Sequence, residues 1–271
     1  MRGHPSYTCH RVDRLPDRVD DGGKYGPIVV NGDLDKQVWR QAERTQRFAQ
    51  MSGEVSLFNT EAAMLWDDDN VYIAFWLEEP DVRCTGQDRD GILWQENTVE
   101  VSIAGAGAYY NLSVNPRNKT SELFFIWKDA YTRGSRYDVA EFDLAIQRPM
   151  VFGGDAQPHD ERGMRWGFLD WRFPGLHTAV QIDGTLNERT KVDRGWTVEL
   201  ALPWEGLQRL ADGATPARSG DTWRLALARN EVIDQCGTRN TATWNWQPTG
   251  APGGVPYVMH KPDRFPRVTF Q

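Results

Sequence analysis

The chain is poor in cysteine and lacks any metal-ligating pattern of histidines. Cys9, Cys84 and Cys236 are the only cysteines among 271 residues. Their odd number and irregular spacing favour free, buried thiols over a disulfide. The five histidines show no i,i+4 pairing and no ligand spacing. A metal centre built on cysteine or histidine is therefore not expected.

Several other signals are missing. No apolar run approaches the roughly 20 residues of a membrane-spanning helix. The N-terminus lacks the apolar core of a signal peptide, so the chain as written is expected to be cytoplasmic unless a leader has been removed. There is no glycine-rich phosphate loop, nucleophile elbow or zinc motif, so no nucleotide cofactor is expected. The net charge of −7 argues against nucleic acid as a partner, and nothing indicates an oligomeric state.

Tryptophan is abundant instead. The chain contains 12 Trp within an ordinary globular composition of 39% hydrophobic and 25% charged residues. Core packing rarely needs so many indoles, and exposed indoles typically hold flat apolar surfaces such as sugar rings. The composition thus predicts a soluble globular protein and points towards a carbohydrate ligand.

The clearest strand spans residues 195–203. Its apolar residues alternate with the others, which predicts one face towards a core; that face comprises Trp196, Val198, Leu200 and Leu202. Thr197, Glu199 and Ala201 fall on the opposite face. Pro203 ends the run because proline cannot donate to a ladder.

Similar patterns recur along the chain. They predict strands at 7–12, 28–30, 61–66, 71–77, 97–103, 109–115, 122–127, 176–184, 223–229, 241–247 and 267–270, with one short helix at 36–42 capped by Asp35. The 71–77 strand is apolar on both faces, which is typical of the middle of a covered sheet. The predicted fold is all-β: a sandwich of two antiparallel sheets with long irregular insertions and one or two short helices.

The predicted domain organisation is simple. Residues 1–27 form an N-terminal extension packed on the domain, and 28–271 form one sandwich with an irregular insertion at about 129–175. Long loops are more often functional than idle.

Acidic turns are the candidate metal ligands. Asp33, Asp35 and Asp67 are candidates for a structural calcium site, together with the neighbouring Asp68 and Asp69. Ordinary turn chemistry explains the same carboxylates equally well.

The order of motifs resembles family 9 carbohydrate-binding modules, especially their larger, often stand-alone variants. The likeness covers the chain from about residue 28 onward and rests on these stretches: Asn31-Gly32-Asp33-Leu34-Asp35 with Trp39; 65–73; 94–101; 174–176; 183–187; 195–204; 220–223; and 244–248. The resemblance implies a β-sandwich in which two Trp side chains stack on both faces of a terminal sugar. Structural calcium is common in such proteins.

By position, the resemblance assigns roles to several residues. Trp94 looks like the first clamp residue, Glu100 like its hydrogen-bonding partner, and Trp244 or Trp246 like the second clamp residue. Ala228 stands near the place of an expected polar amide. Further candidates for sugar contacts are Asn111, in a polar row with Tyr109 and Asn115, and Arg229, in the cluster 229–231.

Each candidate has an ordinary structural alternative. Trp94 could plug the end of the sandwich, Glu100 could simply face solvent, and Arg229 could belong to a salt-bridge patch. Trp244 and Trp246 share one face of their strand, and an inward orientation of that face would place both in the core.

Three functions remain open from the sequence. The first is a non-catalytic protein that binds a sugar or glycan end between two Trp side chains. The second is a glycoside- or uronide-acting enzyme, a hydrolase or lyase, with acid and base candidates in the insertion: Asp155, His159, Asp160 and Glu161. The third is a structural or partner-binding sandwich. Met259 and His260 raise the possibility of haem, but the missing Cys-x-x-Cys-His motif argues against it.

Overall fold

The computed structural model describes residues 6–14, 28–50, 52–85, 93–153, 162–213, 215–235, 238–247 and 260–271. The helices are α1 (Gln37–Gln41), α2 (Leu144–Gln147) and α3 (Trp204–Leu207), with 3-10 turns η1 (Val12–Arg14), η2 (Leu93–Gln95), η3 (Ala140–Phe142) and η6 (Pro262–Arg264). The strands are β1 (Ser6–Arg11), β2 (Ala49–Gln50), β3 (Thr60–Trp66), β4 (Asn70–Glu78), β5 (Thr98–Ala104), β6 (Ala108–Val114), β7 (Thr120–Trp127), β8 (Met150–Phe152), β9 (Arg165–Phe168), β10 (His177–Asp183), β11 (Gly195–Pro203), β12 (Thr222–Gln235), β13 (Thr238–Asn245) and β14 (Arg267–Phe270).

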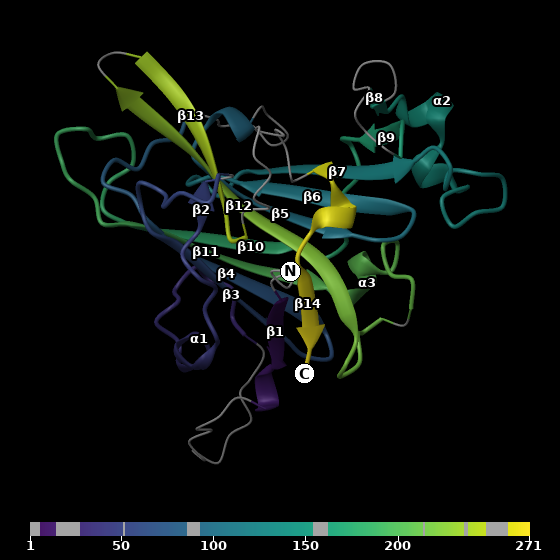
Figure 1. The fold of residues 1–271 in the computed structure, drawn as a ribbon, viewed down its shortest axis with the longest axis horizontal. Coiled ribbons are helices and arrows are strands. Elements are labelled where there is room, and N and C mark those ends of the chain that lie inside the picture. Colours follow the sequence, from purple (N-terminus) through teal and green to yellow (C-terminus); the bar gives the residue numbers. More distant parts are fainter. Residues whose placement is uncertain are drawn as a thin grey trace.

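The strands form two layers, as predicted for a β-sandwich (Figure 1). The first sheet has the order β10-β11-β4-β3, and the second has the order β14-β12-β5-β6-β7-β9-β8, with β13 and β2 attached to β12. Strand β1 joins the two layers: Ser6–Cys9 pair with β14, and His10 and Arg11 pair with β3. Both pairings of β1 are parallel, whereas the other strand pairs are antiparallel. Residues 6–11 of the predicted N-terminal extension are therefore part of the sandwich itself.

The hydrophobic core fills the space between the layers. The prediction for β11 is confirmed, because Trp196, Val198, Leu200 and Leu202 are all buried in this core. From the other layer, β5 contributes its alternate residues, again as predicted: Val99, Val101 and Ile103. The period-2 pattern thus identified the inner face of both sheets.

Strand β4 lies in the middle of the first sheet, as its two apolar faces predicted. Its outer face is covered by the segment that carries α1, and Trp39 is fully buried there against Trp76 with ring centroids 6.3 Å apart. Two details were predicted wrongly. No strand forms at 28–30. Asp35 does not cap α1, since the N-cap is Lys36 without a side-chain hydrogen bond and Asp35 instead pairs with Arg40.

The insertion at 129–175 has more structure than its sequence suggested. It carries η3, α2, β8 and β9, and β9 pairs with β7 at the edge of the second sheet. Phe142, Phe168, Trp171 and Phe173 enter the main core. Isolated aromatics in an aperiodic stretch therefore anchor the insertion on the domain.

Two further expectations concern cysteines and membranes. Cys9 and Cys84 are buried thiols that form no disulfide among the described residues, as expected, and Cys236 lies outside those residues. Among the described residues, no helix is long and apolar enough to cross a membrane.

Candidate functional site

Polar side chains gather on the outer face of the second sheet, where β5 lies between β6 and β12. We call this group the Glu100 row; it comprises Thr98, Glu100, Ser102, Asn111, Ser113, Asn230 and Thr243. Strand register brings them together, because Glu100 lies opposite Ser113 and Asn230 lies opposite both Thr98 and Thr243. Four strands thus contribute to one polar patch, whose members other than Thr243 are buried.

Glu100 is the centre of the row. Its Oε1 accepts a hydrogen bond from Asn230 Nδ2 at 2.6 Å. The side chain is almost fully enclosed, and this burial raises the pKa of Glu100, while hydrogen bonds from Asn230 and Asn111 oppose the rise. The prediction that Glu100 points away from the core is confirmed, but its ordinary alternative of plain solvent exposure is wrong.

The amides beside Glu100 are also fixed by hydrogen bonds. Asn111 Nδ2 donates to Ser102 Oγ at 2.8 Å, and Thr243 Oγ1 donates to Asn230 Oδ1 at 2.7 Å. Held in this way, the amide groups need little reordering to meet a polar ligand. The network therefore presents carboxylate, amide and hydroxyl groups in a preset arrangement.

Ala228 lies directly across from Glu100 and is fully buried. The two residues are register partners on β12 and β5, and Ala228 packs with Phe265 in a small apolar cluster. The amide expected near Ala228 comes instead from Asn230, two residues further along the same face.

Trp244 and Trp246 are not part of this surface. Both belong to the main core, with exposed fractions of 1% and 5%. Trp244 lies opposite Arg229 in the ladder and packs edge-on against Phe58, with ring centroids 6.1 Å apart. The alternation of β13 turns Trp244 inward, so the predicted second wall of a Trp clamp is not formed by either indole.

Arg229 is also directed inward, which corrects its assignment to the sugar site. Its guanidinium is fully buried and bonds Glu79 at 2.7 Å and Glu231 at 2.6 Å. The pKa of Glu79 is raised to about 8, first by burial and then by the charge of Glu231. We call Arg229, Glu79 and Glu231 the buried triad. The alternation of β12 thus separates the predicted polar cluster: Asn230 joins the Glu100 row and its two neighbours do not.

The first clamp candidate, Trp94, lies in η2. This turn packs against β6 and β12, the strands that flank β5. Its side chain lies outside what the structure describes, so its stacking role stays a prediction.

The candidates for other chemistries are not brought to this surface by any described contact. Asp155, His159, Asp160 and Glu161 lie outside the described residues, as does Met259. The ring of His260 contacts Tyr109, with Nδ1 3.0 Å from the phenol oxygen.

The acidic turns are engaged in local hydrogen bonds. Asp67 accepts from the backbone of Asp69 and Asn70 and from the Tyr72 hydroxyl, at 2.8–2.9 Å. Asp33 accepts from the backbone of Asp35 at 2.8 Å. Within the described ranges, no three Asp, Glu, His or Cys side chains come together as metal ligands. These carboxylates therefore do not fit one shared calcium site, and calcium binding stays an untested prediction.

Comparison with known proteins bears on this geometry. The model of the family described as "Carbohydrate family 9 binding domain-like" matches residues 30–118, a range that includes η2, Glu100 and Asn111. The resemblance to family 9 is confirmed. No curated protein matches the chain.

Solved structures share the fold. A family 9 carbohydrate-binding module from Caldicellulosiruptor kristjanssonii, in complex with glucose, has a TM-score of 0.54 at 13% identity and covers 98% of this chain and 96% of its own. The complex of such a module with cellotriose has a TM-score of 0.52 at 13% identity and covers 98% of this chain and 94% of its own. A presumed carbohydrate-binding protein from Bacteroides uniformis ATCC 8492 gives 0.59 at 12% identity, with 99% and 100% covered. The likeness to these three solved structures extends over 98–99% of this chain.

Proposed function

We propose that the protein binds carbohydrate, and that the Glu100 row holds the hydroxyl groups of a sugar or glycan end. The observation that carries this proposal is the carboxylate of Glu100 held between the amides of Asn230 and Asn111. Adjacent sugar hydroxyls each donate and accept, so neighbouring carboxylate and amide groups suit them.

The comparisons support this assignment. The match to the family 9 model includes β5 and β6, which supply Glu100 and Asn111. A relative of the same fold was solved with glucose and with cellotriose, which makes these two sugars the first ligands to test.

Replacing Glu100 with alanine is expected to weaken sugar binding. A hydrogen bond to a charged group contributes roughly 1.5–3 kcal/mol, which corresponds to a loss of about tenfold to a hundredfold in affinity. Glu100→Gln should lose less, because the amide oxygen still accepts a hydroxyl bond. Titration calorimetry against glucose, cellotriose and a panel of other neutral sugars measures these effects.

The matched control is Glu188→Gln, which alters a surface carboxylate in the loop before β11. It should leave affinity unchanged. Circular dichroism checks that each variant is folded. Equal affinity of wild type and Glu100→Ala would place the sugar elsewhere, and a panel without any binder would contradict the proposed function.

Trp94→Ala tests the stacking role separately. If the indole covers one face of the ring, its removal costs about 1–3 kcal/mol of binding free energy through lost burial and stacking. The same titrations give the result. Retained affinity in Trp94→Ala, alongside a loss in Glu100→Ala, would leave the polar site intact and remove the indole from it.

A further inference from the structure

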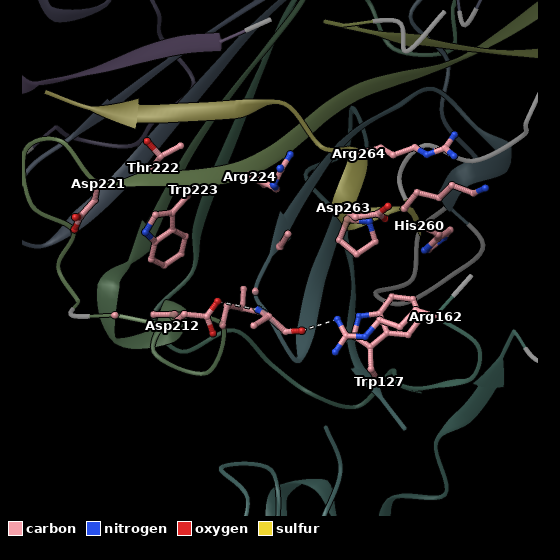
Figure 2. Close-up of a pocket in the computed structure, with 18 of the residues that line it drawn as sticks. Trp127, Arg162, Asp212, Asp221, Thr222, Trp223, Arg224, His260, Asp263 and Arg264 are labelled. Carbon is pink, nitrogen blue, oxygen red and sulfur yellow. Dashed lines mark hydrogen bonds between the residues drawn. The ribbon is translucent and has the colours of Figure 1, made fainter. Parts of the chain in front are cut away.

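A cleft of about 890 Å³ opens at the opposite end of β5 from η2, between the loop before β12 and the η6 turn (Figure 2). Its size falls within the roughly 300–1,000 Å³ of small-molecule sites. Ala104 and Arg224, register partners on β5 and β12, form part of its floor. Ser102, the member of the Glu100 row nearest to Ala104 on β5, is two residues away, or about 7 Å along the strand at about 3.3 Å per residue. None of the described lining residues belongs to the Glu100 row, so the two sites are adjacent but distinct.

The described lining of this cleft is positively charged, although the chain as a whole carries −7. Its charged side chains are the cations Arg162, Arg218, Arg224, Lys261 and Arg264 and the anions Asp212, Asp221 and Asp263. A concave surface of one sign attracts ligands of the other. The excess of cations points to an anionic ligand.

Three of these cations are available to a ligand. Arg162 pairs with Asp129 at 3.1 Å, and Arg224 donates to the carbonyl of Phe265 at 2.9 Å. Among the described residues, no ion-pair partner lies within reach of the side chains of Arg218, Lys261 or Arg264. An Arg fork binds a carboxylate through two parallel hydrogen bonds.

The cleft also contains an indole. Trp223 is half-buried at the start of β12 and packs edge-on against Trp204, with ring centroids 5.9 Å apart. Figure 2 shows Trp223 and Asp221 at one end of the cleft and Arg162, His260 and Arg264 at the other. The second lining indole, Trp127, is buried, and the Arg162 guanidinium lies 5.0 Å from its ring centroid. Trp223 also packs edge-on against Phe270, with ring centroids 6.3 Å apart, and of the two lining indoles it is the one that remains partly exposed.

We propose that this cleft binds an acidic oligosaccharide, a chain of uronic acid residues, with one sugar ring on Trp223 and its carboxylates on the Arg218, Lys261 and Arg264 side chains. The aspartates favour this class over a phosphate-rich ligand. Asp212 and Asp221 accept hydroxyl bonds from a sugar, whereas they repel a dense negative charge.

The test uses trigalacturonate as the probe, with its methyl ester as the uncharged match. Trigalacturonate is expected to bind and to lose affinity steeply as salt is raised, and the ester is expected to bind at least tenfold more weakly. The double variant Lys261→Ala/Arg264→Ala should weaken trigalacturonate binding by about tenfold or more, because the loss of even one charge-assisted hydrogen bond is expected to lower the affinity by about tenfold.

The matched control is Lys191→Ala/Arg194→Ala, which removes one lysine and one arginine from an exposed loop by the other sheet and should leave trigalacturonate binding unchanged. Equal binding of acid and ester, equal losses in the two double variants, or no binding of trigalacturonate would each overturn the proposal.

Discussion

Replacing Arg229 with methionine is expected to lower the free energy of unfolding by about 3–5 kcal/mol, as for other buried ion pairs that lose one partner. The guanidinium is fully buried and binds four groups: Glu79, Glu231, the Thr60 hydroxyl and the Glu78 carbonyl, at 2.6–2.9 Å. Methionine fills a similar volume but leaves two carboxylates enclosed without a cation. Urea unfolding followed by tryptophan fluorescence measures the difference.

The pH dependence separates this cause from simple packing loss. The pKa of Glu79 is about 8 in the fold and ordinarily 4.5, so the folded state holds this proton more tightly than the unfolded chain. The contribution of this proton to the free energy of unfolding is therefore complete below about pH 4.5 and is lost as the pH rises through about 8. Arg229→Met should be most destabilised at alkaline pH and should recover towards pH 5, where Glu79 is protonated.

Two variants complete the comparison. Glu79→Gln should flatten the decline of wild-type stability between pH 5 and 8, because the amide has no proton to lose. Adding Glu231→Gln to Arg229→Met should restore part of the lost stability by removing a second buried charge. An Arg229→Met protein within about 1 kcal/mol of wild type at pH 8 would show that the triad is not a stabilising unit.

The buried triad matters to the Glu100 row through the backbone. Asn97 precedes β5, accepts the Val232 amide at 2.8 Å and donates to Glu79 at 3.3 Å. The start of β5 is therefore fixed against β12 where Thr98 meets Asn230. Loss of the triad should loosen this register, so Arg229→Met should also weaken sugar binding if the protein remains folded.

Local patterns in the sequence predicted most of the strands. Alternation alone identified Val99, Val101 and Ile103 as one face of β5 and the face opposite Glu199 as the core face of β11. Such patterns depend on residues two positions apart, so a single chain contains them in full.

The same patterns could not predict which face of a strand is turned towards the core. Trp244 and Trp246 share a face, yet only the placement of β13 against β12 makes that face the inner one. Arg229 lies on the inner face of β12 together with Leu227. A charged side chain is not expected in a core unless its partners are known, and one of the two carboxylates that pair with Arg229 is distant from it in the sequence. Strict alternation along β12 puts Arg229 and Asn230 on opposite faces of the sheet. This was the signal in the sequence that would have placed Asn230 beside Glu100.

Glu199 shows a further limit, because its role depends on residues more than 150 positions away. Its side chain is fully buried on the outer face of the first sheet. It accepts from Lys36 Nζ at 2.6 Å and from Trp39 Nε1 at 2.7 Å. It also accepts the backbone amides of Asn31 and Gly32 at 2.9 and 3.0 Å. One carboxylate thus joins two motifs on which the resemblance to family 9 rests.

The turn at Gly32 is fitted closely to this arrangement. Gly32 has a φ of +80°, and a Cβ there would lie 2.9 Å from the backbone of Val180. Glycine alone reaches this conformation without strain and allows the backbone to approach β10. The carboxylate of Glu199 then satisfies amides that would otherwise be buried without a partner.

Replacing Glu199 with leucine is expected to destabilise the protein by about 3–5 kcal/mol, because it leaves the Lys36 ammonium, the Trp39 indole N–H and two backbone amides without their acceptor. Thermal or urea unfolding gives the total effect. Hydrogen exchange gives its location: amides in 31–42 should lose protection before those of β5 and β12, since this segment packs on the outer face of the first sheet. Thr197→Val is the matched control on the same face, where one hydroxyl bond to the Gly32 carbonyl is lost and about 1 kcal/mol is expected. If Glu199→Leu is no more destabilising than Thr197→Val, or if protection falls evenly across both sheets, Glu199 does not anchor the segment that carries α1.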